Sequence, residues 1–351
     1  MIININNKKI GDNFRTFIIA EAGVNHNGSL SKAKKLIDIA VKSGADAVKF
    51  QSFLADEIII PKGPKSTYHK ETTGSDKSLS WYNLLKSQEI SYHMHKELIS
   101  YSKKKKIIFL STPYDKKSAT LLFKLGVKAF KVASTDNNNF PFLEFLMKFK
   151  MPIIVSTAMC DFNEVLDIYK FFKKKKYKKF ALLHCTGSYP SSLSDSNLNV
   201  IKTYKKNFDC VIGYSDHTQE INNPLVAVAL GAKIIEKHYT LNKKLPGPDH
   251  RMSLEPKDLS LTIKNIREVE DAMGSKFKRT LKSEYENKKK LKKSLVINKD
   301  LKKNHKLRID DISIKRPAYG LDPKFLNKVL GKKIIKDLKK YSFLKAEYLK
   351  K

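Results

Sequence analysis

Arginine is scarce in this chain, although the net charge is +34. Only six of the 69 basic residues are arginine, and the lysines are spread along the whole sequence. A nucleic-acid-binding protein gathers its basic residues on one face and, for RNA, places aromatic side chains among them. The lysine runs at 103–106 and 173–176 stand instead where we expect helices to end, a position that suits cations. We therefore expect no nucleic-acid partner and interpret the lysines as a solvated surface.

Cysteine, long apolar runs and a leader-like start are lacking as well. The three cysteines, Cys160, Cys185 and Cys210, form no CxxC pair and are odd in number, which favours buried reduced thiols over a disulfide framework. No stretch approaches the roughly 18 apolar residues that a membrane-spanning helix needs. The N-terminal residues lack the apolar core of a signal peptide. We therefore expect a cytoplasmic protein with no membrane partner.

A glycine-rich GxGxxG turn is also lacking, since the first apolar run ends in AEAGVNHNG. The pattern that is present repeats eight times: a short β-branched apolar run ends in polar residues, and an amphipathic helical stretch follows. The runs lie at 17–25, 45–53, 106–114, 127–135, 151–159, 179–190, 210–218 and 232–240. This alternation predicts an α/β fold whose parallel sheet closes into a (β/α)₈ TIM barrel. An open doubly wound sheet is the alternative, and it usually needs the missing glycine-rich turn.

The stretches between the runs carry helix signals. Residues 29–44 space their apolar side chains at three and four and finish at Gly44, a suitable C-cap. Residues 255–274 have Pro256 near the start and Gly274 just past the end.

The organisation of the chain changes after Gly274. We assign residues 1–275 to the barrel and catalytic domain, 276–291 to a charged linker and 292–351 to a small β-rich domain, because short alternating runs with turn signals replace the earlier pattern. The connection at 54–90 is unusually long, and long loops in compact domains are usually functional. We expect it to leave the C-terminal rim of the barrel and to form part of a lid over the site.

Polar side chains stand at the end of every one of the eight runs. In chain order they are Glu21; Lys49 and Gln51; Ser111 and Thr112; Lys131, Ser134 and Asp136; Ser156 and Thr157; His184, Thr186 and Tyr189; Ser215, Asp216 and His217; and Glu236 and His238. The carboxyl ends of barrel strands meet at one rim, where barrel enzymes carry their active sites. Two lysines among several hydroxyls on that rim predict a site for a phosphate or a carboxylate.

Three of these residues suggest further chemistry. His217 and His238 stand on neighbouring strands and are candidates to share a divalent metal, with substrate and water as the remaining ligands. Glu21 is a candidate base or a residue that orients its neighbours. A buried strand tolerates a lysine or a glutamate poorly unless it is paired, so the joint pattern carries this interpretation.

Ten motifs run in order through nearly the whole chain: IIAEAGVNHNG, GADAVKFQ, FLSTPYD, FKVAS, PIIVSTAM, LLHCTGSYP, IGYSDHT, IIEKHYT, LPGPDHRMSLEP and IKRP. With these motifs the chain resembles the sialic acid synthases, which condense phosphoenolpyruvate with an N-acylated hexosamine to form nine-carbon nonulosonic acids. The resemblance implies a (β/α)₈ barrel followed by a small antifreeze-like (SAF) β-clip domain. It also implies a homodimer in which the SAF domains are swapped.

The resemblance implies roles for individual residues. Phosphoenolpyruvate would be held by Lys49, Thr112, Lys131, Ser134, Ser156 and Ser215. A divalent metal, usually Mn²⁺ with Mg²⁺ or Co²⁺ as alternatives, would bind His217 and His238. Glu21 would act in proton transfer, with Lys49, Lys131 and Asp136 as further catalytic residues. The sugar would meet Asp136, Tyr189 and Asp249, together with Arg316 from the small domain of the second subunit.

Three positions depart from the pattern of the family, and all three lie on the sugar side. Asp136 stands where glutamate is usual, Gly187 where asparagine is frequent, and RPAYG, with Ala318 and Tyr319, where RPGxG is common. The acceptor therefore stays open between N-acetylmannosamine and a 2,4-diacetamido-trideoxyhexose. The alternatives are a pseudaminate-type synthase, another phosphoenolpyruvate-condensing barrel, which would lack the small C-terminal domain, and a non-catalytic sugar-binding protein.

Overall fold

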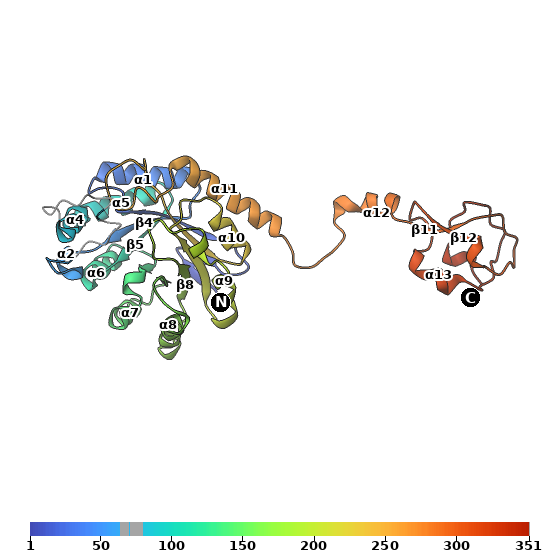
Figure 1. Ribbon diagram of the computed structural model, residues 1–351, viewed down its shortest axis with the longest axis horizontal. Coiled ribbons are helices and arrows are strands. Elements are labelled where there is room, and N and C mark those ends of the chain that lie inside the picture. Colours follow the sequence, from blue (N-terminus) through green and yellow to red (C-terminus); the bar gives the residue numbers. More distant parts are fainter. Residues whose placement is uncertain (64–69, 71–79, 351) are drawn as a thin grey trace. The chain divides into compact units, whose positions relative to one another are not determined.

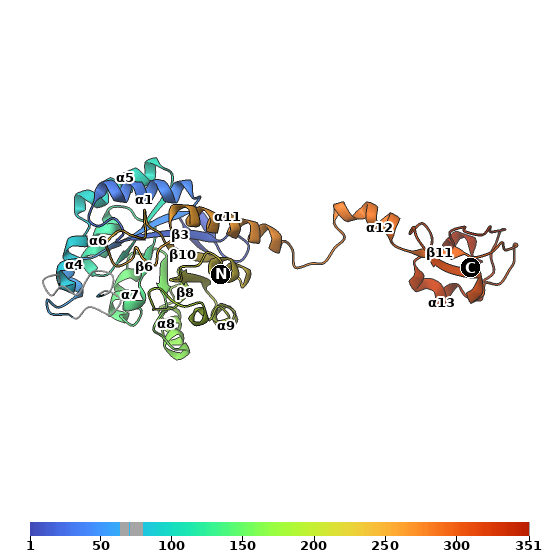
Figure 2. The ribbon, with the colours of Figure 1, turned by 45° about the horizontal axis from the view of Figure 1, so that its top comes forward.

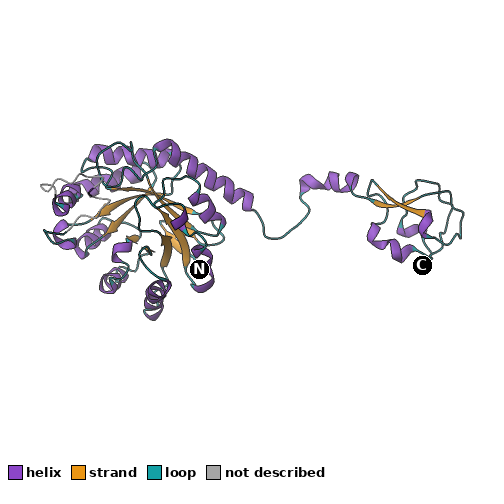
Figure 3. Cartoon of the chain, in the orientation of Figure 1, coloured by secondary structure: helices purple, strands orange, loops and turns teal. Residues whose placement is uncertain are grey.

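The computed structural model describes residues 1–63, 70 and 80–350, which divide into two compact units, Met1–Gly274 and Ser275–Lys351. The first unit is a closed barrel of eight parallel strands in which the last strand, β10, pairs with the first, β3. Helices surround the strands (Figures 1 and 2), and Figure 3 shows the same arrangement by secondary structure. The predicted TIM barrel is confirmed, and closure by β10 excludes the open doubly wound sheet.

The strands of the barrel are short. They are β3 (Phe17–Gly23), β4 (Ala47–Ser52), β5 (Ile108–Pro113), β6 (Phe130–Val132), β7 (Ile153–Ser156), β8 (Phe180–Cys185), β9 (Val211–Asp216) and β10 (Ile234–His238). The helices of this unit are α1 (Leu30–Lys42), α2 (Ala55–Ile58), α4 (Trp81–Gln88), α5 (Tyr92–Lys104), α6 (Lys116–Lys124), α7 (Phe140–Met147), α8 (Phe162–Lys174), α9 (Val200–Asn207), α10 (Asn223–Ala229) and α11 (Pro256–Met273).

The helix ends follow from local chemistry. Ser29 caps α1 by accepting a hydrogen bond from the backbone N–H of Lys32, and Gly44 follows the helix with a φ of +82°, a conformation that glycine adopts without strain. Pro256 opens α11, and Gly274, with a φ of +48°, ends it. Both helices therefore lie where the sequence predicts them.

Side chains alternate along each barrel strand between the interior and the surrounding helices. The inward side chains in the lower half of the barrel form one apolar cluster that contains Phe17, Ile19, Ala47, Ile108, Leu110, Ala129, Ile154, Ala181, Leu183, Val211 and Ile234. At Gly213 this layer has no room for a side chain, because a Cβ would lie 2.4 Å from Leu183 Cδ2 and 2.5 Å from the carbonyl oxygen of Ile234. The lower half of the barrel is thus packed and dry.

A hairpin that sequence analysis missed closes the N-terminal end of the barrel. Strands β1 (Ile3–Ile5) and β2 (Lys8–Ile10) pair antiparallel, and the side chains of Ile3, Ile5 and Ile10 belong to the apolar cluster inside the barrel. The turn residues Asn6 and Asn7 have φ values of +49° and +67°, as a two-residue hairpin turn requires. The interior of the barrel at this end is therefore filled by apolar side chains.

The predicted lid at 54–90 is only partly described. Helices α2 and α4 lie within it, and Leu85 of α4 packs with Phe53 and Ala55 in a small apolar cluster. The segments 64–69 and 71–79 lie outside the described residues, so the lid stays a prediction. Among the described residues, no helix combines the length and apolar composition needed to cross a bilayer.

The second unit contains α12 (Tyr285–Leu291), β11 (Ser294–Ile297), β12 (Ile312–Lys315) and α13 (Leu326–Val329). Strands β11 and β12 pair antiparallel, and isolated bridges such as that between Leu301 and Leu338 extend the pairing. Its core is a small apolar cluster that includes Leu295, Ile297, Leu307, Ile334 and Leu344. A small C-terminal β domain is therefore confirmed, whereas the role of 276–291 as a linker stays a prediction.

A buried carboxylate stabilises this small unit. Asp311 is fully buried and forms ion pairs with Lys299 at 2.9 Å and with His305 at 2.7 Å, and it accepts a hydrogen bond from the backbone N–H of Arg308. Burial opposes its charge, but the contacts with Lys299, Arg308 and His305 prevail and lower the pKa of Asp311 from 3.8 to about 2. A carboxyl with a depressed pKa stabilises the folded state above its ordinary pKa, and this contribution is lost as the pH falls toward the folded-state value.

We predict that Asp311→Asn weakens the second unit at pH 4 and above but has progressively less effect toward pH 2, because the wild-type carboxylate becomes protonated there. The measurement is the rate at which pepsin cleaves within 292–350 of the full-length chain, with wild type and variant compared at each pH. A ratio of cleavage rates that is the same at every pH would contradict this account.

Candidate active site

A polar layer lies directly above the apolar layer of the barrel. The strands continue to alternate, so that Glu21 follows Ile19, Lys49 follows Ala47 and Glu236 follows Ile234 on the inward face. The hollow at this rim is lined by Glu21, Lys49, Gln51, Thr112, Tyr114, Lys131, Ala133, Ser134, Ser156, Cys185, Tyr189, Ser215, His217, Glu236 and His238. The structure thus brings ten of the thirteen predicted site residues to one place.

Two lysines and two glutamates form the centre of this layer, and all four are buried. Lys49 Nζ lies 2.8 Å from Glu21 Oε2, 3.6 Å from Glu236 Oε2 and 3.0 Å from Thr112 Oγ1. Lys131 Nζ lies 3.5 Å from Glu236 Oε1 and donates to Ser156 Oγ at 2.7 Å. Every charge in the cluster therefore has an opposite partner, as burial demands.

The pairing sets the protonation of these groups. Burial, opposed by the charge of Lys49, raises the pKa of Glu21 to about 7. Burial also opposes the charge of Glu236, but Lys131 and Lys49 outweigh it and lower the pKa of that carboxyl. The two carboxyl groups of one cluster thus have pKa values shifted in opposite directions, which is the arrangement expected of an acid–base residue beside a permanently ionised one.

The hollow is narrow, with a volume of about 50 Å³, close to that of one or two water molecules. Its narrowness comes from the lysines, because both reach across the rim toward Glu236.

The two predicted metal ligands lie side by side on β9 and β10, with ring centroids 5.5 Å apart. His217 Nδ1 lies 2.7 Å from the carbonyl oxygen of Thr186 and donates to it, and His217 Nε2 lies 4.0 Å from Cys185 Sγ. His238 Nδ1 is buried and has no hydrogen-bond partner among the described residues, and it lies 3.7 Å from Asp249 Oδ2. Two imidazoles with lone pairs on one rim fit a divalent metal.

The protein alone does not complete a metal shell. Within residues 1–63, 70 and 80–350, no group of three or more His, Cys, Asp or Glu side chains is arranged to hold a metal ion. The fit is therefore to a two-histidine site whose remaining ligands are water or substrate.

Asp216 and Lys237, each of which directly precedes a predicted metal ligand, face out of the barrel. Asp216 and Lys237 form a buried ion pair at 2.6 Å, and Asp216 also accepts hydrogen bonds from the backbone N–H of Thr218 and the hydroxyl of Tyr214. Lys237 Nζ donates to the carbonyl oxygen of Thr218 at 2.5 Å. This pair joins the ends of β9 and β10, the two strands that carry His217 and His238 on their other face.

Several predicted rim residues lie outside the hollow. Asp136 lies in a short 3₁₀ turn after β6 and accepts a hydrogen bond from Asn139, and it does not line the hollow. Asp249 also lies outside the lining but faces His238. Arg316 is exposed in the second unit, directly after β12. Its role in the site and the swapped dimer both stay predictions.

The sequence analysis gave no role in the site to three residues that line the hollow, Glu236, Cys185 and Tyr114. It placed Glu236 at the rim without a role, and it read Cys185 only as a buried thiol. It overlooked Tyr114, although this residue stands two positions after Thr112 and so shares its face. Conversely, His184 points outward and binds the carbonyl oxygen of Ser196. Every second side chain along a strand faces inward. Counting in steps of two from inward residues such as Lys49, Thr112 and Ser215 would have separated inward from outward side chains on their strands.

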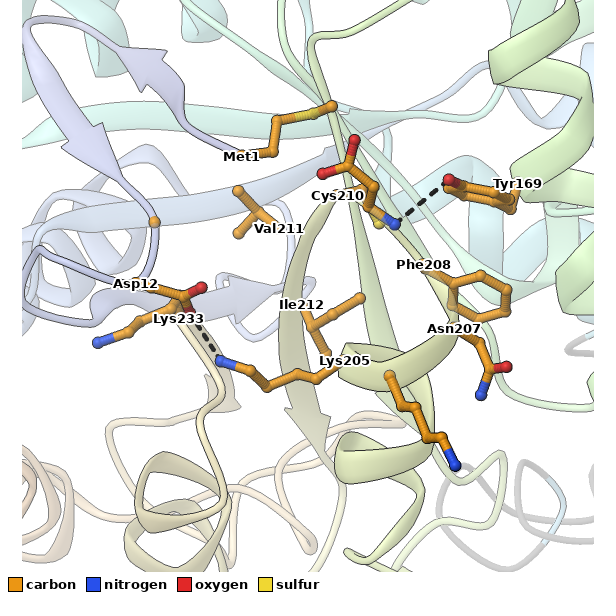
Figure 4. A pocket seen from close by; sticks show the side chains of 13 residues that line it. Met1, Asp12, Tyr169, Lys205, Asn207, Phe208, Cys210, Val211, Ile212 and Lys233 are labelled. Atoms are coloured by element: carbon orange, nitrogen blue, oxygen red, sulfur yellow. Dashed lines mark hydrogen bonds and ion pairs between the residues drawn. The ribbon is translucent and has the colours of Figure 1, made fainter. Parts of the chain in front are cut away.

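A larger hollow, of about 350 Å³, lies at the opposite end of the barrel (Figure 4). It is lined by residues of the N-terminal segment, such as Met1 and Asp12, and by residues of α9 and of the starts of β9 and β10. Its cationic side chains are already engaged: Lys205 pairs with Asp12 at 2.6 Å, and Lys233 donates to the carbonyl oxygen of Phe14 at 3.0 Å. Barrel enzymes carry out their chemistry at the carboxyl ends of the strands. The narrow polar hollow, and not this larger one, is the candidate active site.

A closed (β/α)₈ barrel whose rim gathers paired lysines, hydroxyls and two imidazoles defines an enzyme that acts on an anionic substrate. The profile of the NeuB family matches residues 36–278, and that of the SAF domain matches 292–349. The chain belongs to the NeuB family. It is a nonulosonic acid synthase, a transferase that condenses phosphoenolpyruvate with an amino sugar, and enzymes of this family generally use a divalent metal.

Known proteins match along nearly the whole chain. The N,N'-diacetyllegionaminic acid synthase of Campylobacter jejuni is 44% identical over 327 residues, which cover 93% of this chain and 97% of that one. The pseudaminic acid synthase of the same species is 34% identical over 325 residues, covering 93% and 94%. The crystal structure of the N-acetylneuraminic acid synthetase of Leptospira borgpetersenii superposes with a TM-score of 0.72 at 37% identity, covering 82% of this chain and 95% of that one.

We predict that Lys237→Met destabilises the first unit by about 3–5 kcal/mol, because it leaves Asp216 buried and charged without its partner. The double variant Asp216→Asn/Lys237→Met should recover most of this loss, since it removes both charges. Urea unfolding followed by the fluorescence of the single tryptophan, Trp81, measures both effects. A Lys237→Met variant as stable as wild type would show that the pair is not a stabilising contact.

Proposed function

We propose that this synthase takes a 2,4-diacetamido-trideoxyhexose as its acceptor and forms a legionaminate-type product. The observation that carries the proposal is the higher identity to the N,N'-diacetyllegionaminic acid synthase than to the pseudaminic acid synthase of the same species. N-acetylmannosamine is the second candidate, and the likeness to the Leptospira N-acetylneuraminic acid synthetase supports it.

We propose that phosphoenolpyruvate binds through Lys49, Lys131, Thr112, Ser134, Ser156 and Ser215. Two ammonium groups in a buried layer supply positive charge, and the hydroxyls supply directed donors. The lysines meet Glu236 at 3.5 and 3.6 Å, longer than their contacts with Ser156 and Glu21, so these are the contacts that an anion would replace. Glu236 would then hold both ammonium groups in place while the substrate binds.

The reaction joins C3 of phosphoenolpyruvate to the aldehyde carbon of the open-chain sugar. As this bond forms, positive charge develops at C2, water adds there, and the C–O bond to the phosphate breaks with release of phosphate. Lys49 and Lys131 stabilise the negative charge of the carboxylate and of the leaving phosphate. The rim holds both substrates in one orientation, which converts a bimolecular step into an effectively unimolecular one.

Glu21 is proposed as the residue that takes a proton from the water adding at C2. It is buried against Lys49, and Gln51 Nε2 lies 3.4 Å from its other oxygen. With a pKa of about 7, both of its protonation states are accessible near neutral pH.

The divalent metal is proposed to be Mn²⁺, held by His217 and His238, where it would polarise the aldehyde as a Lewis acid. These two ligands are supported by His238 Nδ1, which has no hydrogen-bond partner among the described residues, and by His217 Nε2, whose contact with Cys185 Sγ is long at 4.0 Å. Asp249, 3.7 Å from His238, would face the same space, and Tyr189, whose ring centroid lies 4.3 Å from that of His217, would flank the sugar.

We predict that the purified enzyme releases phosphate from phosphoenolpyruvate with the 2,4-diacetamido sugar faster than with N-acetylmannosamine, and that added Mn²⁺ increases the rate. The measurement is initial phosphate release with each sugar, after chelation and after return of Mn²⁺, Mg²⁺ or Co²⁺. Faster release with N-acetylmannosamine would reject the proposed acceptor and leave the reaction class intact.

We predict that His217→Ala binds Mn²⁺ more than about tenfold more weakly, since it removes one of only two protein ligands. Titration calorimetry of the chelated protein with Mn²⁺ measures this directly, without turnover. The matched control is His93→Ala, which changes an exposed histidine on α5 and should leave Mn²⁺ affinity unchanged. Equal affinities in the two variants would remove His217 from the metal site.

A further inference from the structure

Tyr114 lines the active-site hollow but has no role in the reaction described so far. It follows β5 directly, two positions after Thr112, and its backbone N–H donates to the carbonyl oxygen of Ser52 at 3.1 Å. Its ring stands edge-on against Phe53, with centroids 5.9 Å apart and planes at 84°. The backbone and the ring are therefore both held in place, and the position of the hydroxyl is set by packing.

The hydroxyl of Tyr114 makes no hydrogen bond to any described residue, whereas the neighbouring donors of the hollow are engaged. Lys49 donates to Thr112, Lys131 donates to Ser156, and Ser215 donates to Glu236 at 3.0 Å. A hydroxyl that is fixed by its ring and has no partner among residues 1–63, 70 and 80–350 is available to a ligand at the edge of the hollow.

The charges around Tyr114 indicate which substrate it meets. Burial, and then the negative charges of Glu21, Asp249 and Asp136, raise the pKa of Tyr114 well above its ordinary value, so the hydroxyl keeps its proton and can donate it. The charges of Asp249 and Asp136, which form no ion pair with Lys49 or Lys131, disfavour an anion such as phosphoenolpyruvate at this hydroxyl. A neutral sugar, whose hydroxyl and acetamido oxygens accept hydrogen bonds, suits this surrounding.

We propose that Tyr114 binds the acceptor sugar by donating a hydrogen bond from its hydroxyl to one of the sugar's oxygens. The phosphoenolpyruvate contacts lie one layer deeper, at Lys49, Thr112 and Lys131, so Tyr114 faces the second substrate. This assignment rests on the proposed function, because it requires a sugar to be the second substrate at this rim.

The test is Tyr114→Phe, which removes the hydroxyl and keeps the ring against Phe53. Initial rates are measured while the sugar is varied at saturating phosphoenolpyruvate, and then with the roles exchanged. We expect kcat/KM for the sugar to fall about three- to tenfold, the worth of one hydrogen bond, while kcat/KM for phosphoenolpyruvate and the melting temperature stay unchanged.

The matched control is Tyr101→Phe, whose hydroxyl donates to Asp38 at 3.0 Å on the helical outside of the barrel; it should behave as wild type. An unchanged kcat/KM for the sugar in Tyr114→Phe, or an equal loss toward both substrates, overturns the inference. Failure of the proposed function would give a different result: wild-type enzyme would consume no phosphoenolpyruvate with any amino sugar. The two failures are therefore distinguishable.

Discussion

The structure depends on keeping four charged side chains inside a barrel. Each lysine or glutamate loses hydration there at a cost of several kcal/mol, which is offset only by close and complete pairing. Lys49 meets this need with Glu21, Thr112 and Glu236, and Lys131 with Ser156 and Glu236. Because the partners come from different strands, the cluster exists only in the closed barrel. The same need places two ammonium groups next to Glu236 inside the hollow, where we propose that an anionic substrate replaces it.

The inward and outward faces of the same strands have different roles. At the ends of β9 and β10 the inward residues Ser215, His217 and His238 line the hollow, and the outward residues Asp216 and Lys237 form a buried ion pair that joins the two strand ends. An apolar layer below and the β1–β2 hairpin beneath it close the other end of the barrel. The polar hollow therefore lies at the rim opposite the hairpin.

Much of this arrangement could be predicted from residue patterns. Runs ending in Glu21, Lys49, Ser156 and His238 indicated parallel strands, and parallel strands of a barrel must end at one rim. The pattern did not say which neighbours face inward, so His184 was placed with the rim although it points outward. Tyr114 was missed because an aromatic residue after a strand is more often core than ligand. The hairpin was missed because its two strands are only three residues long.

By itself, the sequence determined the number and order of the barrel strands, the presence of cationic and hydroxyl groups at the rim, and the family, because all of these follow from local residue types and their spacing. Only the tertiary structure decided which side chains share the hollow. Side chains alternate along a strand, but which of them face inward is defined only when the sheet closes into a barrel. The tertiary structure alone paired Lys49 and Lys131 with Glu236, brought His217 within reach of His238, and left the hydroxyl of Tyr114 without a partner among the described residues. These are contacts between residues far apart in the chain, and distance along a sequence does not encode distance in space.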